Sequence, residues 1–372
     1  MKVLENAGEG SPEEVSQDAD YVYVPCLSDE LENVVFARFP RAEYWKLGFL
    51  NKRLLSLVKS GEIYKIRKEM KIKEPSVFML ASGDTNWWTF DRKFQSRRKL
   101  PIIPSDYNFE YGDKESFSAG THLFVSGKEI EGAVVWRYEL AANQWFKGPS
   151  MITPRCLFAS ATCGNFAFIA GGLETETCKL ILNSAEKYDS ETKSWERLPN
   201  MIRRRKLCSG CCMDNKFYVM GGLDENQKEL KCGEYFDQET KTWTLVPNML
   251  KDIPLSISQS PPLIAVANNE LYSLDACSNE LKVYEKESNS WMKLGPVPVR
   301  ADAQKGWGVA FKSLGNELLL IGATSVSASE RALTIYTCSP DPAMEKLKWR
   351  QIECGGGTKL NPFIRNCAVM VA

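Results

Sequence analysis

The chain has 372 residues, of which 44% are apolar, and its 47 lysines and arginines balance 47 aspartates and glutamates. This is the composition of an ordinary folded protein, and the absence of a basic excess argues against a protein that binds nucleic acid or membrane surfaces. A single histidine, His122, excludes catalytic sites that need two or more imidazoles, and we predict no catalytic residues, no metal and no cofactor.

Residues 1–20 hold six acidic side chains, one lysine and almost no apolar run. We expect a disordered acidic tail here rather than a secretory signal, which needs a basic start followed by an apolar stretch. No stretch approaches the roughly 18 uninterrupted apolar residues of a membrane span. We therefore expect the protein to work in the nucleus, the cytoplasm or both, with its 12 cysteines as thiols.

Residues 21–74 carry the apolar period of helices. In the first helical stretch an apolar side chain recurs every four positions, at Leu27, Leu31, Val35 and Phe39. This spacing predicts a helix with one apolar face, and Pro40 ends it. Two more helical runs follow, at 44–58 and 63–72. Three short helices cannot bury this much apolar surface alone, so the bundle either packs on the rest of the chain or docks a partner.

From residue 75 the helical period disappears and the chain repeats itself. Six short apolar runs, each ending in small or turn residues, begin 44 to 54 residues apart, at Phe78, His122, Phe166, Phe217, Leu271 and Leu318. Four runs are followed by an aromatic residue and, seven positions later, a tryptophan, in the pairs Tyr138/Trp145, Tyr188/Trp195, Phe236/Trp243 and Tyr284/Trp291. A period near fifty with four short strands per unit is typical of a β-propeller, in which the tryptophan is large enough to fill the gap between neighbouring sheets.

The first repeat lacks the strand and turn that open the others. Residues 361–372 resemble the opening of a repeat and stop where its hairpin turn belongs. We therefore predict six blades over 75–372, with strand 366–372 completing the first blade and joining the two ends of the ring. Each sheet exposes an apolar face that only the next sheet can cover, so ring closure buries all of them.

The repeated Gly-Gly, Tyr-Asp, Trp and Pro-x-Met pattern resembles kelch repeats, over about 80% of the chain. Residues 26–40, with Leu-Ser-Asp-Glu-Leu near their start and Phe-Pro at their end, and the following 44–57 resemble an F-box. Ser28 stands where that family usually has proline, and Asn51 where it usually has cysteine. The order of the two modules is similar to that of plant F-box/kelch-repeat proteins. We predict a mainly β protein, a six-bladed kelch β-propeller preceded by a small α-helical F-box domain.

The resemblance implies a non-catalytic substrate receptor of an SCF-type ubiquitin ligase. In that family the F-box binds a Skp1-like adaptor, and through it a cullin, while the propeller holds the protein to be ubiquitinated. The resemblance therefore leads us to expect adaptor contacts from Leu27, Leu31, Val35, Phe39, Pro40, Leu47 and Leu50. Each of these residues can instead line the core of the bundle itself. The loops carry no pattern that identifies the target protein.

Four arginines lie in segments that lead into the inner strands of repeats: Arg155, Arg203, Arg205 and Arg365. In a propeller such segments lie near the mouth of the central channel. A ring of arginines there would bind an acidic or phosphorylated partner through bidentate bonds, and we predict on this basis that they contact the substrate. For the basic clusters at 203–206 and 97–99, the alternatives are a nuclear-import signal and ordinary solvated loop side chains.

Two other classes of protein stay open. A kelch scaffold without a role in ubiquitination would use the helices only as a cap. A propeller oxidase that resembles galactose oxidase needs two histidines and a tyrosine, which His122 cannot supply, and we expect His122 to be structural. The cysteine cluster Cys208, Cys211 and Cys212 lacks a second pair at zinc-binding spacing, so we expect buried thiols there.

Overall fold

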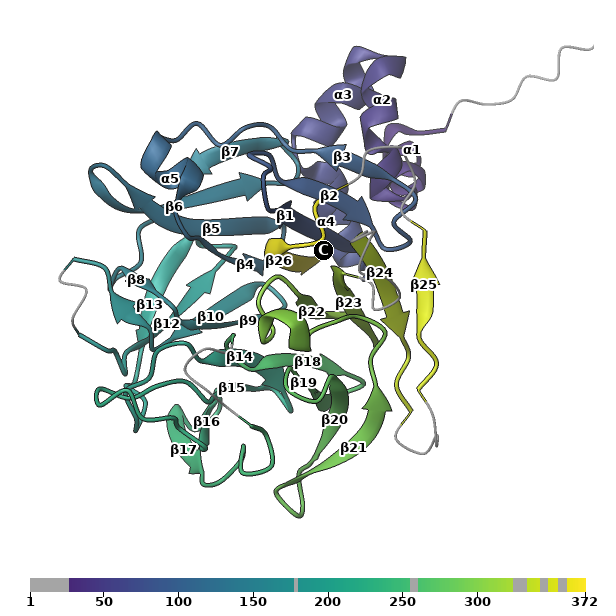
Figure 1. Ribbon diagram of the computed structural model, residues 1–372. Coiled ribbons are helices and arrows are strands. Elements are labelled where there is room, and N and C mark those ends of the chain that lie inside the picture. The colour runs from purple at the N-terminus through teal and green to yellow at the C-terminus, as the bar shows by residue number, and fades with distance from the viewer. Residues whose placement is uncertain (1–26, 177–179, 255–259, 324–332, 342–346, 354–359) are drawn as a thin grey trace, which may run out of the picture.

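The computed structural model describes residues 27–176, 180–254, 260–323, 333–341, 347–353 and 360–372. Six antiparallel four-stranded sheets stand in a ring, and a helical bundle lies at one edge of it (Figure 1). The predicted fold, a six-bladed propeller preceded by a small helical domain, is confirmed. The tail predicted at 1–20 lies outside the described residues.

The bundle has four α-helices and a 3-10 turn at Arg41–Glu43: α1 (Asp29–Ala37), α2 (Tyr44–Leu50), α3 (Lys52–Lys59) and α4 (Glu62–Glu69). The second predicted run is thus two helices, because Asn51 has an extended backbone and starts a new one. Its side-chain Oδ1 accepts a hydrogen bond from the backbone N of Leu54 at 2.8 Å. The helices share a small apolar core: Ala37, Tyr44, Leu47, Leu54, Leu57 and Ile63.

Each blade has four strands, named in order from the axis of the ring outward. Blades 1 to 3 are β26 (Ile364–Val371), β1 (Pro75–Ala81), β2 (Trp88–Asp91) and β3 (Arg97–Lys99); β4 (Glu115–Ala119), β5 (His122–Glu129), β6 (Gly132–Glu139) and β7 (Gln144–Lys147); and β9 (Ala159–Cys163), β10 (Phe166–Ala170), β12 (Ala185–Asp189) and β13 (Ser194–Leu198). Blades 4 to 6 are β14 (Ser209–Met213), β15 (Lys216–Met220), β16 (Gly233–Asp237) and β17 (Thr242–Val246); β18 (Leu263–Ala267), β19 (Glu270–Asp275), β20 (Glu280–Glu285) and β21 (Ser290–Pro296); and β22 (Ala310–Leu314), β23 (Glu317–Ala323), β24 (Leu333–Cys338) and β25 (Arg350–Ile352). A two-stranded ribbon, β8 (Arg155–Cys156) and β11 (Leu173–Glu174), and the short helices α5 (Tyr107–Tyr111) and Asp302–Gln304 lie in the connections.

The C-terminal strand closes the ring. β26 pairs antiparallel with β1, from Pro75 opposite Val371 to Ala81 opposite Ile364. It is two residues longer at its start than the segment 366–372 predicted from the sequence. The innermost strands contact one another in a complete cycle, which runs β26, β4, β9, β14, β18, β22 and back to β26. The first blade therefore combines the two ends of the propeller.

Apolar packing lies between the blades. Among the described residues, six apolar clusters each join two neighbouring blades, so every interface in the ring has its own core. Each of the four repeat tryptophans also donates its indole N–H, at 2.7 to 3.0 Å, to a carbonyl just after the outer strand of the preceding blade: Trp145 to Pro101, Trp195 to Pro149, Trp243 to Pro199 and Trp291 to Met249. The predicted gap-filling residue thus adds a directional bond to its apolar contact.

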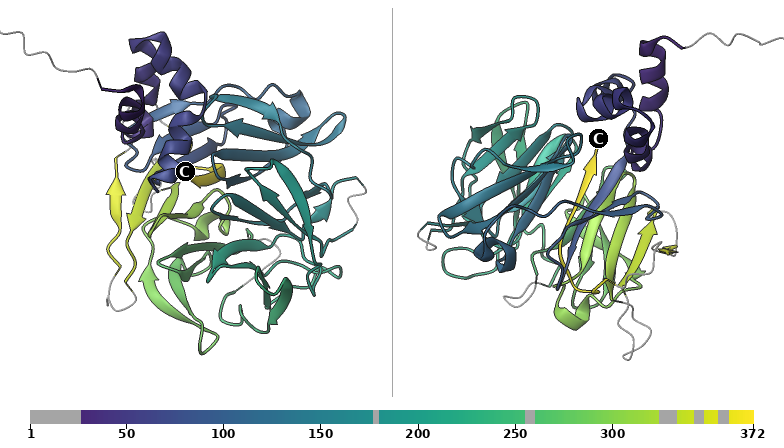
Figure 2. Two further views of the ribbon diagram at one scale, coloured as in Figure 1. Left: turned by 180° about the vertical axis from the view of Figure 1, so that it is seen from behind. Right: turned by 90° about the horizontal axis from the view of Figure 1, so that it is seen from above.

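The two faces of the ring differ. Hairpin turns at Gly120, Gly164 and Gly315 lie on the same face as α4, with which they line one cavity. Because successive connections in an antiparallel sheet alternate between its ends, the links from one blade to the next, including α5, lie on the opposite face. The right panel of Figure 2 shows the ring edge-on, with α1–α4 on one side and α5 on the other. We call these the hairpin face and the loop face.

Candidate functional site

The first and third helices begin at the two positions where the chain departs from the F-box pattern. Ser28 caps α1, because its Oγ accepts a hydrogen bond from the backbone N of Leu31 at 3.4 Å. Asn51 caps α3 in the same way. A side-chain oxygen at a helix start satisfies one of the free N–H groups of the first turn, so both departures preserve the helices.

Apolar side chains project into solvent from the first two helices. We define the exposed apolar set as seven residues with these exposed fractions: Leu27 57%, Leu31 56%, Val35 42%, Phe39 40%, Trp45 54%, Phe49 80% and Leu50 68%. Pro40, between the helices, is exposed as well. The structure thus keeps six of the seven predicted contact residues at the surface. Large apolar side chains that remain uncovered on one small bundle are a common sign of an interaction surface.

The seventh predicted contact residue, Leu47, is not at the surface. It is only 4% exposed and packs in the core of the bundle. The prediction grouped Leu47 with Leu50, which lie on similar sides of α2 because they are three positions apart. Leu50 is nevertheless the last residue of the helix and stays 68% exposed, whereas Leu47 packs inward. Trp45 and Phe49 were missed. They lie four positions apart on the outer side of α2, with ring centroids 5.8 Å apart. Apolar residues surround most of this short helix, so no spacing in the sequence distinguishes these two as exposed.

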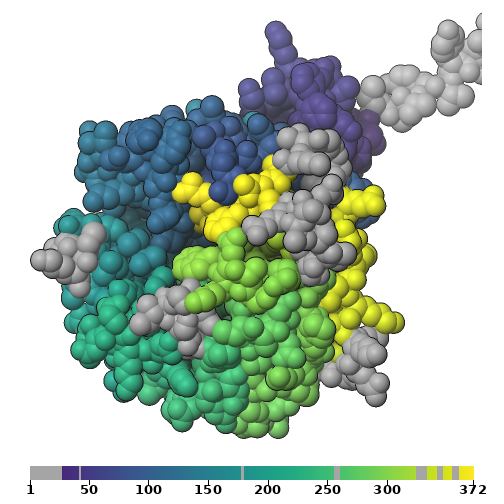
Figure 3. Space-filling view, in the orientation of Figure 1, coloured from purple at the N-terminus to yellow at the C-terminus, as the bar shows by residue number. Residues whose placement is uncertain are grey.

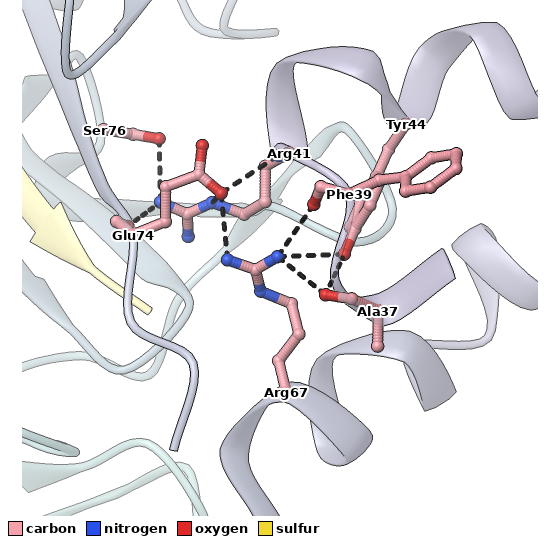
Figure 4. Close-up of polar contacts among 7 residues, drawn as sticks. All are labelled: Ala37, Phe39, Arg41, Tyr44, Arg67, Glu74 and Ser76. Carbon is pink, nitrogen blue, oxygen red and sulfur yellow. Dashed lines mark hydrogen bonds and ion pairs between the residues drawn. The ribbon is translucent and has the colours of Figure 1, made fainter. Parts of the chain in front are cut away.

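Arg67 of α4 holds the end of α1. Its Nη1 donates hydrogen bonds to the carbonyl oxygens of Ala37 (2.9 Å) and Phe39 (3.0 Å) and to the hydroxyl of Tyr44 (3.1 Å), as Figure 4 shows. The last carbonyls of a helix have no partner within it, and a buried guanidinium satisfies them here. These hydrogen bonds from Arg67 therefore fix the position of the segment that carries Phe39 and Pro40.

Glu74 links the bundle to the propeller. Its Oε2 accepts hydrogen bonds from Arg67 Nη2 (2.9 Å) and from the backbone N of Arg41 (3.0 Å). The Nη2 of Arg41 in turn donates to the Glu74 carbonyl and to the hydroxyl of Ser76 in β1 (Figure 4). Burial holds the pKa of Arg41 below its usual value, and the Glu74 carboxylate opposes that shift. We call Arg41, Arg67, Glu74 and Ser76 the junction.

Two of the four arginines predicted to contact substrate are structural. Arg155 and Arg205 have fully buried side chains that pair with Glu186 (2.5 Å) and Glu234 (2.6 Å). The same carboxylates accept backbone N–H groups from the loop that enters the blade, including that of Arg203. A buried guanidinium paired in this way cannot reach a partner, so the predicted ring of arginines does not exist.

The other two arginines lie nearer the surface. Arg203 is exposed on the loop face, two residues before the buried Arg205. Arg365 is half-buried and donates through Nη2 to the carbonyl oxygens of Tyr111 (3.2 Å) and Gly112 (3.0 Å) at the end of α5. Its role is to hold that helix, and of the four only Arg203 keeps a free position for contact with a target.

The loop face carries its own exposed apolar residues around α5. Tyr107 and Tyr111 contact each other with ring centroids 4.5 Å apart and ring planes tilted by 37°, and Ile102 and Ile130 are also exposed. Asp106 anchors the helix by accepting hydrogen bonds from the backbone N of Phe109 (3.0 Å) and of Ile130 (2.6 Å). Figure 3 shows this face, which is hollowed near the axis of the ring. The sequence did not predict this group, because residues 100–114 fall outside the repeat pattern.

The remaining predicted residues lie inside the propeller. His122 is buried against Phe124 and Tyr188, and burial lowers its pKa to about 4. Cys208 and Cys211 are buried, and burial raises the pKa of each thiol, to about 11 and about 12. Within the described ranges no group of three or more His, Cys, Asp or Glu side chains is placed to hold a metal ion.

None of the described helices is long and apolar enough to cross a membrane. A family model for the kelch motif matches residues 154–202 and 204–250, which form most of blades 3 and 4. These segments contain the buried Arg–Glu pairs and two of the repeat tryptophans.

Three proteins of Arabidopsis thaliana resemble the chain along most of its length. F-box/kelch-repeat protein At3g27150 is 54% identical over 362 residues, which cover 96% of this chain and 86% of that protein. F-box/kelch-repeat protein At1g26930 is 36% identical and covers 99% and 88% of the two chains, and F-box/kelch-repeat protein SKIP11 is 38% identical and covers 90% and 72%. With its capped helical domain and its six-bladed ring, the chain belongs to the plant F-box/kelch-repeat proteins, in which an F-box precedes a kelch propeller that serves as an interaction domain.

Proposed function

We propose that this protein is a non-catalytic substrate receptor of an SCF-type ubiquitin ligase. The helical bundle docks a Skp1-like adaptor, which connects it to a cullin, and the propeller holds the protein to be ubiquitinated. The observation that carries the proposal is the exposed apolar set on α1 and α2. Family membership supports the same assignment.

The exposed apolar set has the properties of an interface rather than of an ordinary surface. Phe49 and Trp45 are aromatic anchors of the kind that dominate binding energy when a partner covers them. The bundle cannot bury them itself, because its core is already filled from the other sides of the same helices. Covering apolar area releases about 25 cal/mol for each Å², so a partner gains most where the bundle has left these side chains uncovered.

Adaptor capture tests the proposal directly. The variants Leu31→Asp and Phe49→Asp each place a charge in the exposed apolar set, and each should weaken capture of a purified Skp1-type adaptor by about 30-fold or more, the loss typical of a hot-spot residue. Both positions are exposed, so the propeller should fold as before. The matched control is Ile130→Asp, a similarly exposed apolar residue on the loop face. Equal capture by all three variants, or no capture by the parent protein, would favour a kelch scaffold without a ubiquitin role.

The loop face is the proposed site for the target protein. It lies opposite the helices, and it carries exposed Tyr107, Tyr111 and Ile130 together with the exposed cation Arg203. Affinity purification with the proteasome inhibited should recover a protein that is lost with Tyr107→Ala/Tyr111→Ala but kept with Phe49→Asp. Recovery that is unchanged by the double variant would move the target site away from α5.

A further inference from the structure

A cavity of about 810 Å³ lies on the axis of the ring, beneath α4. Its walls are the inner strands of the blades, and its roof on the hairpin face is α4 with the segment that follows it, residues 71–73. Figure 2 shows this helix from behind, running toward the axis of the ring beside the C-terminus. The cavity therefore has one wall from the helical domain and the others from the propeller.

The charged residues of this cavity are almost all of one sign. Five lysines line it: Lys65, Lys68, Lys71, Lys73 and Lys312. Against them stands one carboxylate side chain, that of Glu191. A cavity with low-dielectric walls concentrates the field of such a cluster and raises the local concentration of anions.

Three of these lysines have no carboxylate partner within the described parts of the chain. Lys65 pairs with Glu62 at 3.1 Å, and Lys68 pairs with Glu191. Lys71, Lys73 and the half-buried Lys312 make no ion pair with any described residue. The unpaired cations come from both sides of the cavity, two from the segment after α4 and one from β22.

Five hydroxyl groups line the wall between the charges. Ser116, Ser118 and Thr162 already donate hydrogen bonds to Asn366 Oδ1 and to the carbonyl oxygens of Val369 and Ser118. Ser160 and Ser313 donate to no described residue, so their hydroxyls are available to a ligand. Hydroxyls can donate to phosphate oxygens, and lysine is a common point-charge ligand for phosphate. The kelch repeat does not require lysine at the inner-strand position of Lys312, because the equivalent positions of other blades hold Ala161, Cys211 and Ala265. This cation is therefore not a feature of the repeat itself.

We propose that the cavity beneath α4 binds a small molecule that carries several phosphate groups. Three unpaired cations around one cavity favour a compact ligand with several negative charges, and a polyphosphate supplies this. An acidic peptide spreads its charges at one per side chain, so it places fewer of them within this volume. Because the lysines belong to both domains, the bound ligand also fixes α4 against the inner strands.

Titration calorimetry with sodium tripolyphosphate tests the site on the full chain. The parent protein should bind one equivalent, with an affinity that falls as salt is raised, because salt screens the lysines. The variant Lys71→Glu/Lys73→Glu should weaken binding by about tenfold or more, and Lys312→Met should weaken it from the propeller side. Lys71 and Lys73 are exposed, so these substitutions leave the fold intact. The matched control is Lys128→Glu/Lys251→Glu, which reverses two exposed lysines outside the cavity.

Hydrogen exchange with and without tripolyphosphate gives a second readout, and protection should rise in α4 and β22 of the parent protein only. No saturable binding by the parent, or equal weakening by the control pair, overturns the proposal. Binding of an oligoglutamate peptide in preference to tripolyphosphate also overturns it, and assigns the cavity to an acidic chain. None of these results depends on adaptor capture, which Leu31→Asp tests separately.

Discussion

At the scale of single residues, His122 links stability to pH. The structure buries its neutral imidazole beside Phe124 and Tyr188, and burial, with Arg137 nearby, lowers its pKa from 6.5 to about 4, although Glu139 opposes the shift. In the unfolded chain the His122 imidazole is protonated near pH 6.5, whereas in the folded chain it is protonated only near pH 4. Stability from this residue is therefore present above pH 6.5 and is lost as the pH falls through that window, by up to about 3 kcal/mol. Urea unfolding measured from pH 7 to pH 4 should show a shallower loss for His122→Gln, and parallel curves for both proteins would contradict this role.

The sequence around an arginine does not by itself show whether its side chain is exposed or buried. Arg203 and Arg205 belong to one basic run, yet the first is exposed and the second is fully buried. The distinguishing signal was periodic rather than local, since Arg205 and Arg155 occupy equivalent positions in successive repeats and Arg203 does not. Each repeated arginine meets a glutamate from a strand about thirty residues later, and that tertiary contact outweighs the usual exposure of charged side chains.

At the scale of elements, the C-terminal strand carries the closure of the ring. Met370 is fully buried in the apolar core between blades 1 and 2, whereas Val371 is exposed on the same strand. Met370→Asp buries an unpaired charge and should lower the free energy of unfolding by about 3 kcal/mol or more, while Val371→Asp should change it little. Thermal melts of the two variants against the parent protein check this. Similar melting temperatures for both would mean that β26 contributes little to the ring.

The period of the sequence was sufficient to predict the blades, because each repeat needs the same hydrophobic strand, and four of the six share the tryptophan that packs against the neighbouring blade. It was less informative for the bundle. On a helix as short as α2 the apolar residues cover most of the circumference, so their spacing cannot separate the buried Leu47 from the exposed Phe49. Helix α5 belongs to no repeat. Its position depends on Arg365, which is far from it in the sequence, and on Asp106, which lies outside the repeat pattern.

At the scale of the whole molecule, the junction determines how the two domains sit together. Glu74 is the carboxylate shared by Arg41 and Arg67, so Glu74→Gln leaves two buried guanidiniums without their counter-charge. We expect a loss of about 3 kcal/mol and a bundle that moves relative to the ring. Trypsin should then cut between α4 and β1 faster, and small-angle scattering should show a larger particle. Glu69→Gln, an exposed change on α4, is the control, and equal cleavage of both variants would show that the domains are held by other contacts.

The opposite placement of the bundle and α5 has a consequence for how such proteins diversify. Under the proposed function, mutations in the links between blades alter which target the loop face binds without changing the residues that project from α1 and α2, because the whole thickness of the β-sheets separates them. Selection can therefore conserve the exposed residues of α1 and α2 while the links between blades change to bind other target proteins. A genome can multiply specificities from this architecture by duplicating one gene and rewriting only its loops.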